Sequence, residues 1–221
     1  MSVTQIRVGV ITPDRGDRPL FMEQYYRMMD RQTLKPEVIE VVDYAPVSDD
    51  CDITPRYRYG YDKLRNCGLD VILFIESDDW YSPRYIEVMV SEWDRLGRPD
   101  LFGPNYTIYY HLGLRKDFVF RHEKRSSMMS TLIKADLDFS WPADDYPYTD
   151  SHLWINIKNK LTFLPKEMIC LGIKHGVGKV GGRFHTDMLG MYKENKISLE
   201  KVAGEDYWFY DSIQTPNKLK G

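Results

Sequence analysis

The first 100 residues alternate between short apolar segments and amphipathic segments, and this order constrains the fold more than any other feature of the chain. Residues 6–11, 38–42 and 71–75 have the length and β-branched composition of buried strands. Helical spacing of apolar residues follows each of them, at 19–32, 61–67 and 86–96. Strands and helices that alternate in this way form a right-handed, mostly parallel sheet. The sequence therefore predicts an α/β fold.

The length of the chain predicts one domain. Its 221 residues, 43% of them hydrophobic, can close one substantial core but are few for two domains of roughly 100 to 200 residues each. We divide residues 1–221 into a first half, 1–100, a second half, 101–213, and a frayed tail, 214–221. Short aromatic runs at 106–113 and 116–121 predict added strands in the second half, and residues 144–159 contain a helix.

Charge, hydropathy and cysteine usage exclude several classes of protein. The net charge of −3 differs from that of a strongly basic protein that coats nucleic acid. The longest apolar stretch, around residues 71–75, is far shorter than the roughly 18 residues of a membrane span, and no signal-peptide pattern opens the chain. Cys51, Cys67 and Cys170 form no CxxC pair, which argues against a disulfide framework or a structural zinc site. We expect a soluble, cytoplasmic protein without membrane partners; its oligomeric state is not predicted.

Polar residues follow each of the three predicted strands. They are Thr12 to Arg15, Asp43, and the run from Glu76 to Asp79. Because ligands of open α/β sheets bind outside the carboxyl ends of the strands, these three groups are expected to converge on one site. The carboxylates of the last run follow a fully apolar strand, where a divalent cation such as Mg²⁺ or Mn²⁺ is their natural partner. The alternative is an acidic N-terminus for the helix that begins near Pro83.

Three segments of the first half carry a family resemblance. In chain order they are VGVITPDRGDRP, QTLKPEVIEVVDYAP and KLRNCGLDVILFIESDDWYSPRYIE. Over residues 5 to 90 their order and spacing resemble the nucleotide-sugar half of GT-A fold glycosyltransferases, particularly family 2. The resemblance implies a Rossmann-type, nucleotide-sugar-binding sheet in the first half and a smaller, acceptor-facing part in the second.

The resemblance also implies roles for individual residues, and it implies Mn²⁺ or Mg²⁺ as the cofactor. Thr12, Pro13 and Arg15 would line the nucleoside. Asp43 would accept a hydrogen bond from the base, and Arg65 would face the nucleotide. Asp78 and Asp79 would hold the ribose and the metal that bridges the diphosphate. Glu76 stands where the family commonly has Asp, so which acid ligates the metal stays open.

A glycosyl transfer with inversion needs one carboxylate as general base beside the acceptor hydroxyl. The stretch ADDYPYTDSHLW offers Asp144, Asp145 and Asp150. The TDSHLW segment resembles the family's acidic motif at the start of the helix below the acceptor, so we assign Asp150 as the base. The alternative is that Thr149 or Asp150 simply caps that helix.

A glycine-rich segment late in the chain, GIKHGVGKVGGRFH, offers two histidines. GT-A enzymes often bring a late histidine to the metal or the diphosphate, and His175 and His185 are both candidates for this position. Flanking basic residues suit a leaving diphosphate, namely Lys174, Lys179 and Arg183.

One basic and aromatic region of the second half suggests what kind of acceptor the protein binds. Residues 114–127 carry five basic and two acidic side chains, a local excess of +3, and follow Tyr106, Tyr109 and Tyr110. Such a surface could contact phosphates and stack on bases, although a solvated strand pair explains it equally well. The small size also resembles compact phage glycosyltransferases that modify hydroxymethylated bases in DNA.

The sequence thus predicts a metal-dependent, inverting glycosyltransferase that uses a nucleotide-sugar, with a UDP-sugar favoured, and that has DNA as a possible acceptor. A non-catalytic nucleotide-sugar or glycan binding module and a nucleotidyltransferase are the alternatives.

Overall fold

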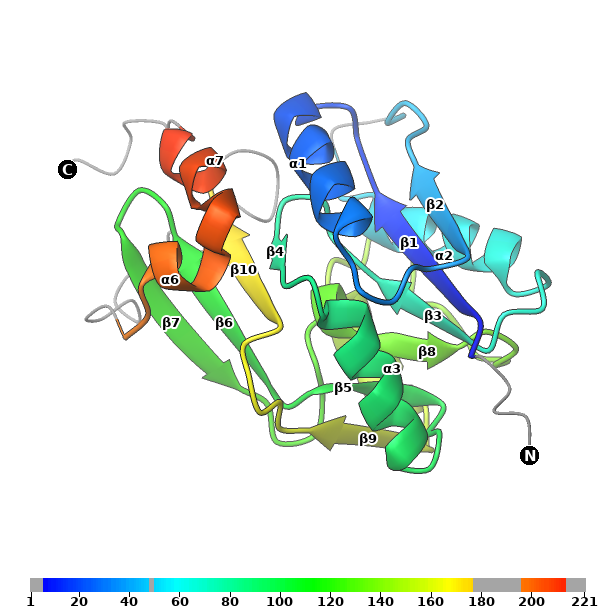
Figure 1. Cartoon of the computed structure of the whole chain (residues 1–221). Coiled ribbons are helices and arrows are strands. Elements are labelled where there is room, and N and C mark those ends of the chain that lie inside the picture. The colour runs from blue at the N-terminus through cyan, green and yellow to red at the C-terminus, as the bar shows by residue number, and fades with distance from the viewer. Residues whose placement is uncertain (1–5, 48–49, 177–195, 214–221) are drawn as a thin grey trace.

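A six-stranded sheet forms the centre of the computed structural model, which describes residues 6–47, 50–176 and 196–213 (Figure 1). The strand order is β2-β1-β3-β8-β5-β9. The strands are β1 (Val8–Pro13), β2 (Val38–Val42), β3 (Val71–Phe74), β5 (Leu101–Pro104), β8 (Leu132–Lys134) and β9 (Lys160–Phe163). Only β8 runs against the others, since it pairs antiparallel with both β3 and β5. The predicted mostly parallel α/β sheet is confirmed.

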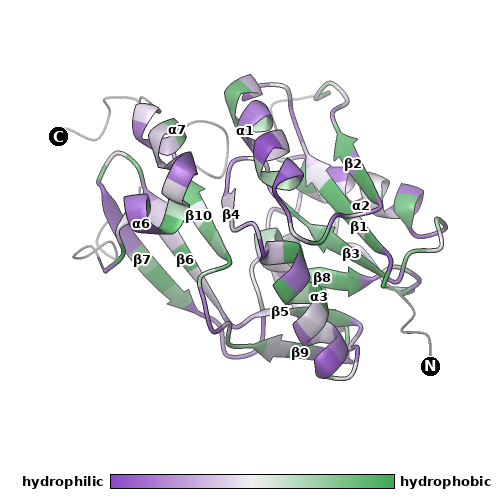
Figure 2. Cartoon of the chain, in the orientation of Figure 1, coloured by the Kyte–Doolittle hydropathy of each residue, from purple (hydrophilic) through white to green (hydrophobic). Residues whose placement is uncertain are grey.

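Helices cover both faces of this sheet. They are α1 (Pro19–Asp30), α2 (Ile53–Leu64), α3 (Tyr85–Arg95) and α4 (Thr149–Asn156). Alternate residues of β3 enter two different cores: Leu73 joins the core with α1 and α3, and Phe74 joins the core with α2 and α4. The strands β1, β3 and β8 are mainly hydrophobic in Figure 2, as expected for strands buried on both faces.

A second sheet of four strands stands beside the first, in the order β4-β10-β6-β7. Its strands are β4 (Trp80–Tyr81), β6 (Tyr106–His111), β7 (Lys116–Arg121) and β10 (Cys170–Lys174), and the short helices α6 (Leu199–Ala203) and α7 (Tyr207–Ser212) lie near it. The sheets do not divide at residue 100, because β4 comes from the first half while β5, β8 and β9 come from the second.

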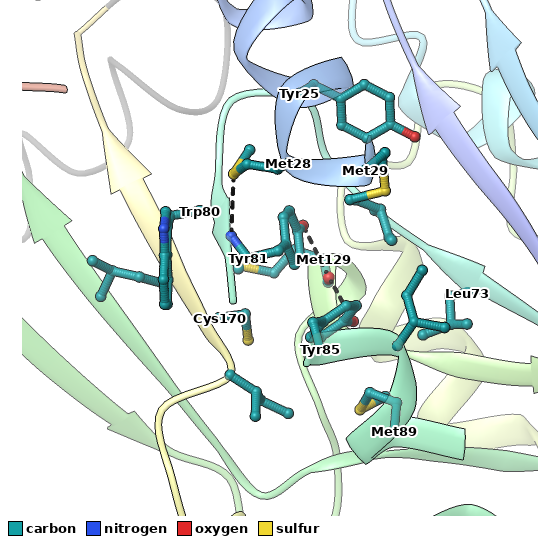
Figure 3. Packing of buried hydrophobic residues seen from close by; sticks show 14 of the residues in the cluster. Tyr25, Met28, Met29, Leu73, Trp80, Tyr81, Tyr85, Met89, Met129 and Cys170 are labelled. Carbon is teal, nitrogen blue, oxygen red and sulfur yellow. Dashed lines mark hydrogen bonds between the residues drawn. The ribbon is translucent and has the colours of Figure 1, made fainter. Parts of the chain in front are cut away.

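Buried aromatic and methionine side chains join the two sheets. Tyr81 of β4 and Tyr85 of α3 both donate hydrogen bonds to the carbonyl of Met129, at 3.1 and 3.3 Å (Figure 3). Met129 belongs to the short 3-10 helix η1 (Met128–Ser130), which leads into β8. The elements that follow the loop between β3 and β4 are therefore anchored to the turn that leads into β8 of the large sheet.

The second helix differs from its prediction. The sequence predicts a helix at 61–67, whereas α2 spans Ile53–Leu64. Its buried face includes Arg56 and Gly60, which interrupt the apolar spacing that marks a helix in a sequence. Gly60 is required there because an added Cβ would lie 2.6 Å from a side-chain carbon of Ile11. Arg56 and Gly60 thus allow α2 to pack closely against β1.

Other predictions can be compared only over the described residues. No helix there is long and apolar enough to cross a membrane. Cys51, Cys67 and Cys170 are free thiols, of which Cys170 is buried and Cys67 exposed. The predicted tail, 214–221, lies outside the described residues.

Candidate functional site

The polar residues predicted at three strand ends do share one edge of the sheet. β1 pairs in parallel with β2 and with β3, so their carboxyl ends point the same way. Backbone hydrogen bonds join these ends: the amide of Asp14 donates to Val42 (3.0 Å), and the amide of Ile75 donates to Ile11 (3.0 Å). The loop after β1 therefore lies between the end of β2 and the acidic loop, which we define as Glu76–Asp79.

Three carboxylates of the acidic loop come together. Glu76, Asp78 and Asp79 each offer one oxygen, and these oxygens lie within 4.8 Å of one another. Asp78 and Asp79 are 7% and 1% exposed, which makes the cluster costly unless cations neutralise it. The sequence analysis proposed Asp78 and Asp79 as metal ligands and left the part of Glu76 open. The structure brings Glu76 into the same group, and its carboxylate accepts a hydrogen bond from Tyr57 (3.0 Å).

Asp79 has the geometry of a cation ligand. One of its oxygens, Oδ1, accepts a hydrogen bond from the amide of Ile173 (2.7 Å). The other, Oδ2, is buried without a hydrogen-bonding partner among the described residues. Burial and the neighbouring carboxylates raise the pKa of Asp79 well above its ordinary value, although Lys174 opposes them. An unpartnered buried carboxylate oxygen beside two other acids fits Mg²⁺ or Mn²⁺.

Asp78 differs from Asp79, because two side chains contact one of its carboxylate oxygens. Its Oδ2 forms an ion pair with Arg18 and a 2.9 Å hydrogen bond with Nε2 of His175. Burial alone would raise the pKa of Asp78, but Arg18 and His175 outweigh it and hold the pKa well below the ordinary value. The sequence analysis missed Arg18, because it chose Arg15 from the two arginines that the same loop offers.

His175 reaches the site, but through Asp78. Its imidazole lies against the ring of Phe21, with 4.5 Å between the centroids, and is fully buried. The structure therefore places His175 as a partner of an acidic residue, outside the group of three candidate ligands. Lys174 also faces the acids, with its ammonium 4.8 Å from the ring centre of Tyr109. The other candidates of this segment, His185, Lys179 and Arg183, lie outside the described residues.

Of the residues predicted to contact the nucleoside, Thr12 and Pro13 are buried and Asp43 is exposed. Thr12 is fully buried and donates to the hydroxyl of Tyr25 (2.7 Å), so its side chain faces α1 rather than the open edge. Pro13 ends β1 and is buried too. Arg15 forms an ion pair with Asp52 at the start of α2. Asp43, directly after β2, is exposed at the edge of the sheet.

Arg56 is a further residue that the sequence analysis missed. This buried guanidinium donates to the carbonyls of Asp14 (2.6 Å), Val42 (2.8 Å) and Tyr44 (2.8 Å), and its Nε donates to Asp52 (2.9 Å). These acceptors belong to the loops after β1 and β2 and to the start of α2. A fully buried arginine that satisfies carbonyls at both strand ends holds these two loops and the start of α2 together.

Arg65 lies at the opposite edge of the sheet. It follows the last residue of α2. Three residues later the carbonyl of Gly68 accepts a hydrogen bond from Arg7 (2.7 Å), which directly precedes β1. The end of α2 therefore lies beside the amino ends of the strands, and the structure does not bring Arg65 to the acidic loop. Arg56, nine residues earlier in the same helix, is the arginine at the carboxyl edge.

Asp150 lies in the first turn of α4 and faces Arg125, with which it forms an ion pair. Burial raises the pKa of Asp150 above its ordinary value, and the guanidinium of Arg125 opposes this shift. Burial and, to a smaller extent, the charges of Asp79 and Asp150 raise the pKa of Tyr109, and the ammonium of Lys174 opposes this shift. Asp144 is a surface residue paired with Arg58 (2.7 Å).

The three tyrosines before the basic region do not share one surface. Side chains alternate along β6, so Tyr106 and Tyr110 face the side opposite to Tyr109. Tyr110 is buried in the main core. In the basic region itself, Arg115 forms an ion pair with Asp211 and Arg125 with Asp150, and Lys116, Arg121 and Lys124 are exposed.

Tyr109 depends on a glycine in the next strand, which gives a first testable prediction. An added Cβ at Gly172 would lie 2.4 Å from Cδ1 of Tyr109. Gly172→Ala is therefore expected to lower the free energy of unfolding by about 1 to 3 kcal/mol through overpacking. Urea denaturation measures this free energy. In a Tyr109→Ala background, Gly172→Ala should lower the free energy of unfolding by at least about 1 kcal/mol less than it does in the wild type. An equal cost in both backgrounds would show that the two residues do not interact.

Comparisons with known proteins match this chain to solved structures only. No family model and no curated protein sequence matches it. The crystal structure of S. aureus TarS 1-349 in complex with UDP-GlcNAc matches with a TM-score of 0.58 and 12% sequence identity, over 89% of this chain and 63% of that chain. TarS 1-349 in complex with UDP matches with a TM-score of 0.52 and 13% identity, over 76% of this chain and 60% of that one.

This chain therefore spans less than two thirds of the length of the TarS chains that it matches, and 37% of the length in the crystal structure named S. aureus TarS, at a TM-score of 0.50 and 13% identity. Identities this low carry information on the fold alone. The parallel sheet predicted from the sequence, the strand order seen in the structure and these structural matches agree: this chain has a GT-A-like α/β fold.

Proposed function

We propose that this protein is a metal-dependent glycosyltransferase that moves a sugar from a UDP-sugar to an acceptor hydroxyl with inversion at the anomeric carbon. One observation carries the proposal: three carboxylates converge at the carboxyl end of β3, and Oδ2 of Asp79 is buried there without a partner among the described residues. The fold supports it, because a TarS structure of similar fold is described as a complex with UDP-GlcNAc.

In this proposal Glu76, Asp78 and Asp79 hold Mn²⁺ or Mg²⁺. The bound cation supplies Lewis-acid stabilisation of the negative charge that develops on the leaving diphosphate. Arg18 and Lys174 already face the same acids, so both cationic side chains are positioned to bind a diphosphate that enters beside them. Their fixed charges would stabilise the leaving group without further reorganisation.

The nucleoside of the donor is assigned to the edge formed by the loops after β1 and β2. Arg56 holds both loops through their carbonyls. Asp43 is exposed at this edge and can accept a hydrogen bond from a base, and Arg15, in the loop after β1, donates to the carbonyl of Asp50 (3.2 Å). We assign the positioning of this subsite to Arg56 rather than to Arg65, which lies at the other edge.

Asp150 is the proposed general base. Its carboxylate accepts the proton of the acceptor hydroxyl while the hydroxyl oxygen bonds to the anomeric carbon. The bond between that carbon and the diphosphate oxygen breaks, and UDP leaves with the electron pair. Burial raises the pKa of Asp150 above its ordinary value, which makes the carboxylate a stronger base than an exposed aspartate. Arg125 orients it through their ion pair.

The acceptor that we propose to test is a hydroxymethylated base in DNA. The exposed side chains of Lys116, Arg121 and Lys124 can contact phosphates. The base would have to leave the helix to reach Asp150. Transfer of radiolabelled sugar from the donor to hydroxymethylated duplex DNA tests this acceptor, with unmodified duplex as the control. If label enters neither duplex, DNA is not the acceptor.

The donor is tested by a thermal-shift screen of nucleotide-sugars with and without Mn²⁺. A ligand that binds only the folded state stabilises it by about 2.7 kcal/mol at 100 times its dissociation constant. We expect UDP-sugars with Mn²⁺ to raise the unfolding temperature by several degrees, and UDP-sugars with EDTA to raise it little. Slow release of UDP from the stabilising donor would then distinguish an enzyme from a binding module. Stabilisation by no nucleotide-sugar would contradict the proposal.

A further inference from the structure

The last described segment, Leu199–Ser212, reaches the acidic loop from far along the chain. It comprises α6, the 3-10 helix η3 (Gly204–Asp206) and α7. Leu199, Ala203 and Tyr210 are buried in the core that α1 and α3 also share. Figure 1 shows α6 and α7 near the small sheet, on the side where α1 stands. None of the functions proposed above assigns a role to this segment.

Asp206 is the first link between this segment and the site. Both oxygens of its buried carboxylate accept from Arg31, each at 2.6 Å. Oδ1 also accepts from Gln24 of α1, and Oδ2 accepts from the indole Nε1 of Trp80 at 3.1 Å. Trp80 directly follows Asp79. One carboxylate thus joins α1, β4 and the C-terminal segment, and charge-assisted hydrogen bonds of this kind are the stronger ones.

Tyr210 is the second link. Its hydroxyl donates to the backbone carbonyl of Asp79 at 3.2 Å, across 131 positions of sequence. Both groups are buried, so breaking the bond would leave a desolvated carbonyl without its partner. The two links act on consecutive residues: Tyr210 holds the backbone of Asp79, and Asp206 holds the side chain of Trp80.

We propose that Leu199–Ser212 is a positioning element for the acidic loop, in which Tyr210 and Asp206 fix the direction of the Asp79 carboxylate. Asp79 needs such support because its Oδ2 makes no hydrogen bond of its own with the described residues. Ile173 restrains only Oδ1, and Tyr210 holds the backbone carbonyl of Asp79, so the two hydrogen bonds together keep this carboxylate beside the other acids in spite of their repulsion. The role of the element in cation binding rests on the proposed function, whereas its effect on the loop does not.

Tyr210→Phe tests the proposal because it removes only one hydroxyl. We expect amide hydrogen exchange in the peptide covering residues 76–82 to become about fivefold faster, which corresponds to about 1 kcal/mol of local stability. In the presence of UDP, the dissociation constant for Mn²⁺, measured by electron paramagnetic resonance, should rise by a similar factor.

Tyr61→Phe is the matched control. Tyr61 is as buried as Tyr210, and its hydroxyl also donates to a backbone carbonyl, that of Leu137, at 2.7 Å. It belongs to the core of α2 and α4, so this variant should leave exchange in residues 76–82 and Mn²⁺ affinity unchanged.

The proposal is overturned if Tyr210→Phe leaves exchange of residues 76–82 at the wild-type rate, or if Tyr61→Phe accelerates it equally. A wild-type protein that binds no Mn²⁺ with UDP would contradict the proposed function instead. The exchange measurement would still decide whether the segment positions the loop, so the two failures are distinguishable.

Discussion

Asp79→Asn is expected to remove metal-dependent donor binding, with the Mn²⁺ affinity in the presence of UDP falling at least about 100-fold. Loss of a group that merely supports a metal ligand typically costs 10- to 100-fold, and a direct ligand contributes more. The amide can still accept the hydrogen bond from Ile173 through its oxygen. Since the variant also removes one of three neighbouring negative charges, the metal-free protein should unfold at an unchanged or higher temperature. Isothermal titration with Mn²⁺ and thermal unfolding measure the two effects.

Asp70→Asn provides the control for this variant. Asp70 also accepts a backbone hydrogen bond, from the amide of Arg7 at 2.7 Å, but it lies before β3 at the opposite edge of the sheet. It should retain wild-type Mn²⁺ affinity. Wild-type affinity in Asp79→Asn, with Asp70→Asn unchanged as well, would remove Asp79 from the proposed metal site.

Three strands of the large sheet, β1, β2 and β3, could be predicted because their signals are local. Residues 71–75 are apolar at every position, and a buried parallel strand such as β3 needs this composition on both faces. Parallel pairing puts the carboxyl ends of all these strands at one edge, so the shared edge of Asp43 and the acidic loop followed from the predicted strand direction. The antiparallel insertion of β8 between β3 and β5 has no comparable local signal, since it depends on pairing between distant segments.

The site was predicted less completely than the fold, for reasons visible in particular residues. Arg56 stands on the buried face of α2, where an apolar residue would have marked the helix, so both the helix start and the arginine were missed. Arg15 and Arg18 are indistinguishable in a loop sequence, and only the structure shows which of them contacts Asp78. Tyr210 and Asp79 are 131 positions apart in the sequence, and no sequence pattern specifies the contact between them.

Asp150→Asn is expected to lower sugar transfer by about 10²- to 10⁴-fold while leaving the affinity for the UDP-sugar close to wild type, because a general base acts on the acceptor. Its pH profile supplies a second readout. A base must be deprotonated, so wild-type turnover should be full above the pKa of Asp150 and fall as the pH drops through it. Burial raises that pKa, so the fall should begin at a higher pH than for an exposed aspartate. The residual activity of Asp150→Asn should not show this fall at low pH, which we call the acidic limb of the profile.

Asp144→Asn and Asp145→Asn are the comparisons that decide which acid acts. Asp144 is exposed and paired with Arg58 on the surface, and Asp145 is exposed too, so neither is positioned by burial as Asp150 is. Both variants should keep turnover and the acidic limb of the pH profile. Donor binding, measured in all three variants, separates a lost base from a misfolded site. If Asp145→Asn or Asp144→Asn lost turnover while Asp150→Asn kept it, Asp150 would be only a residue of the first turn of α4, and the base would lie before the helix.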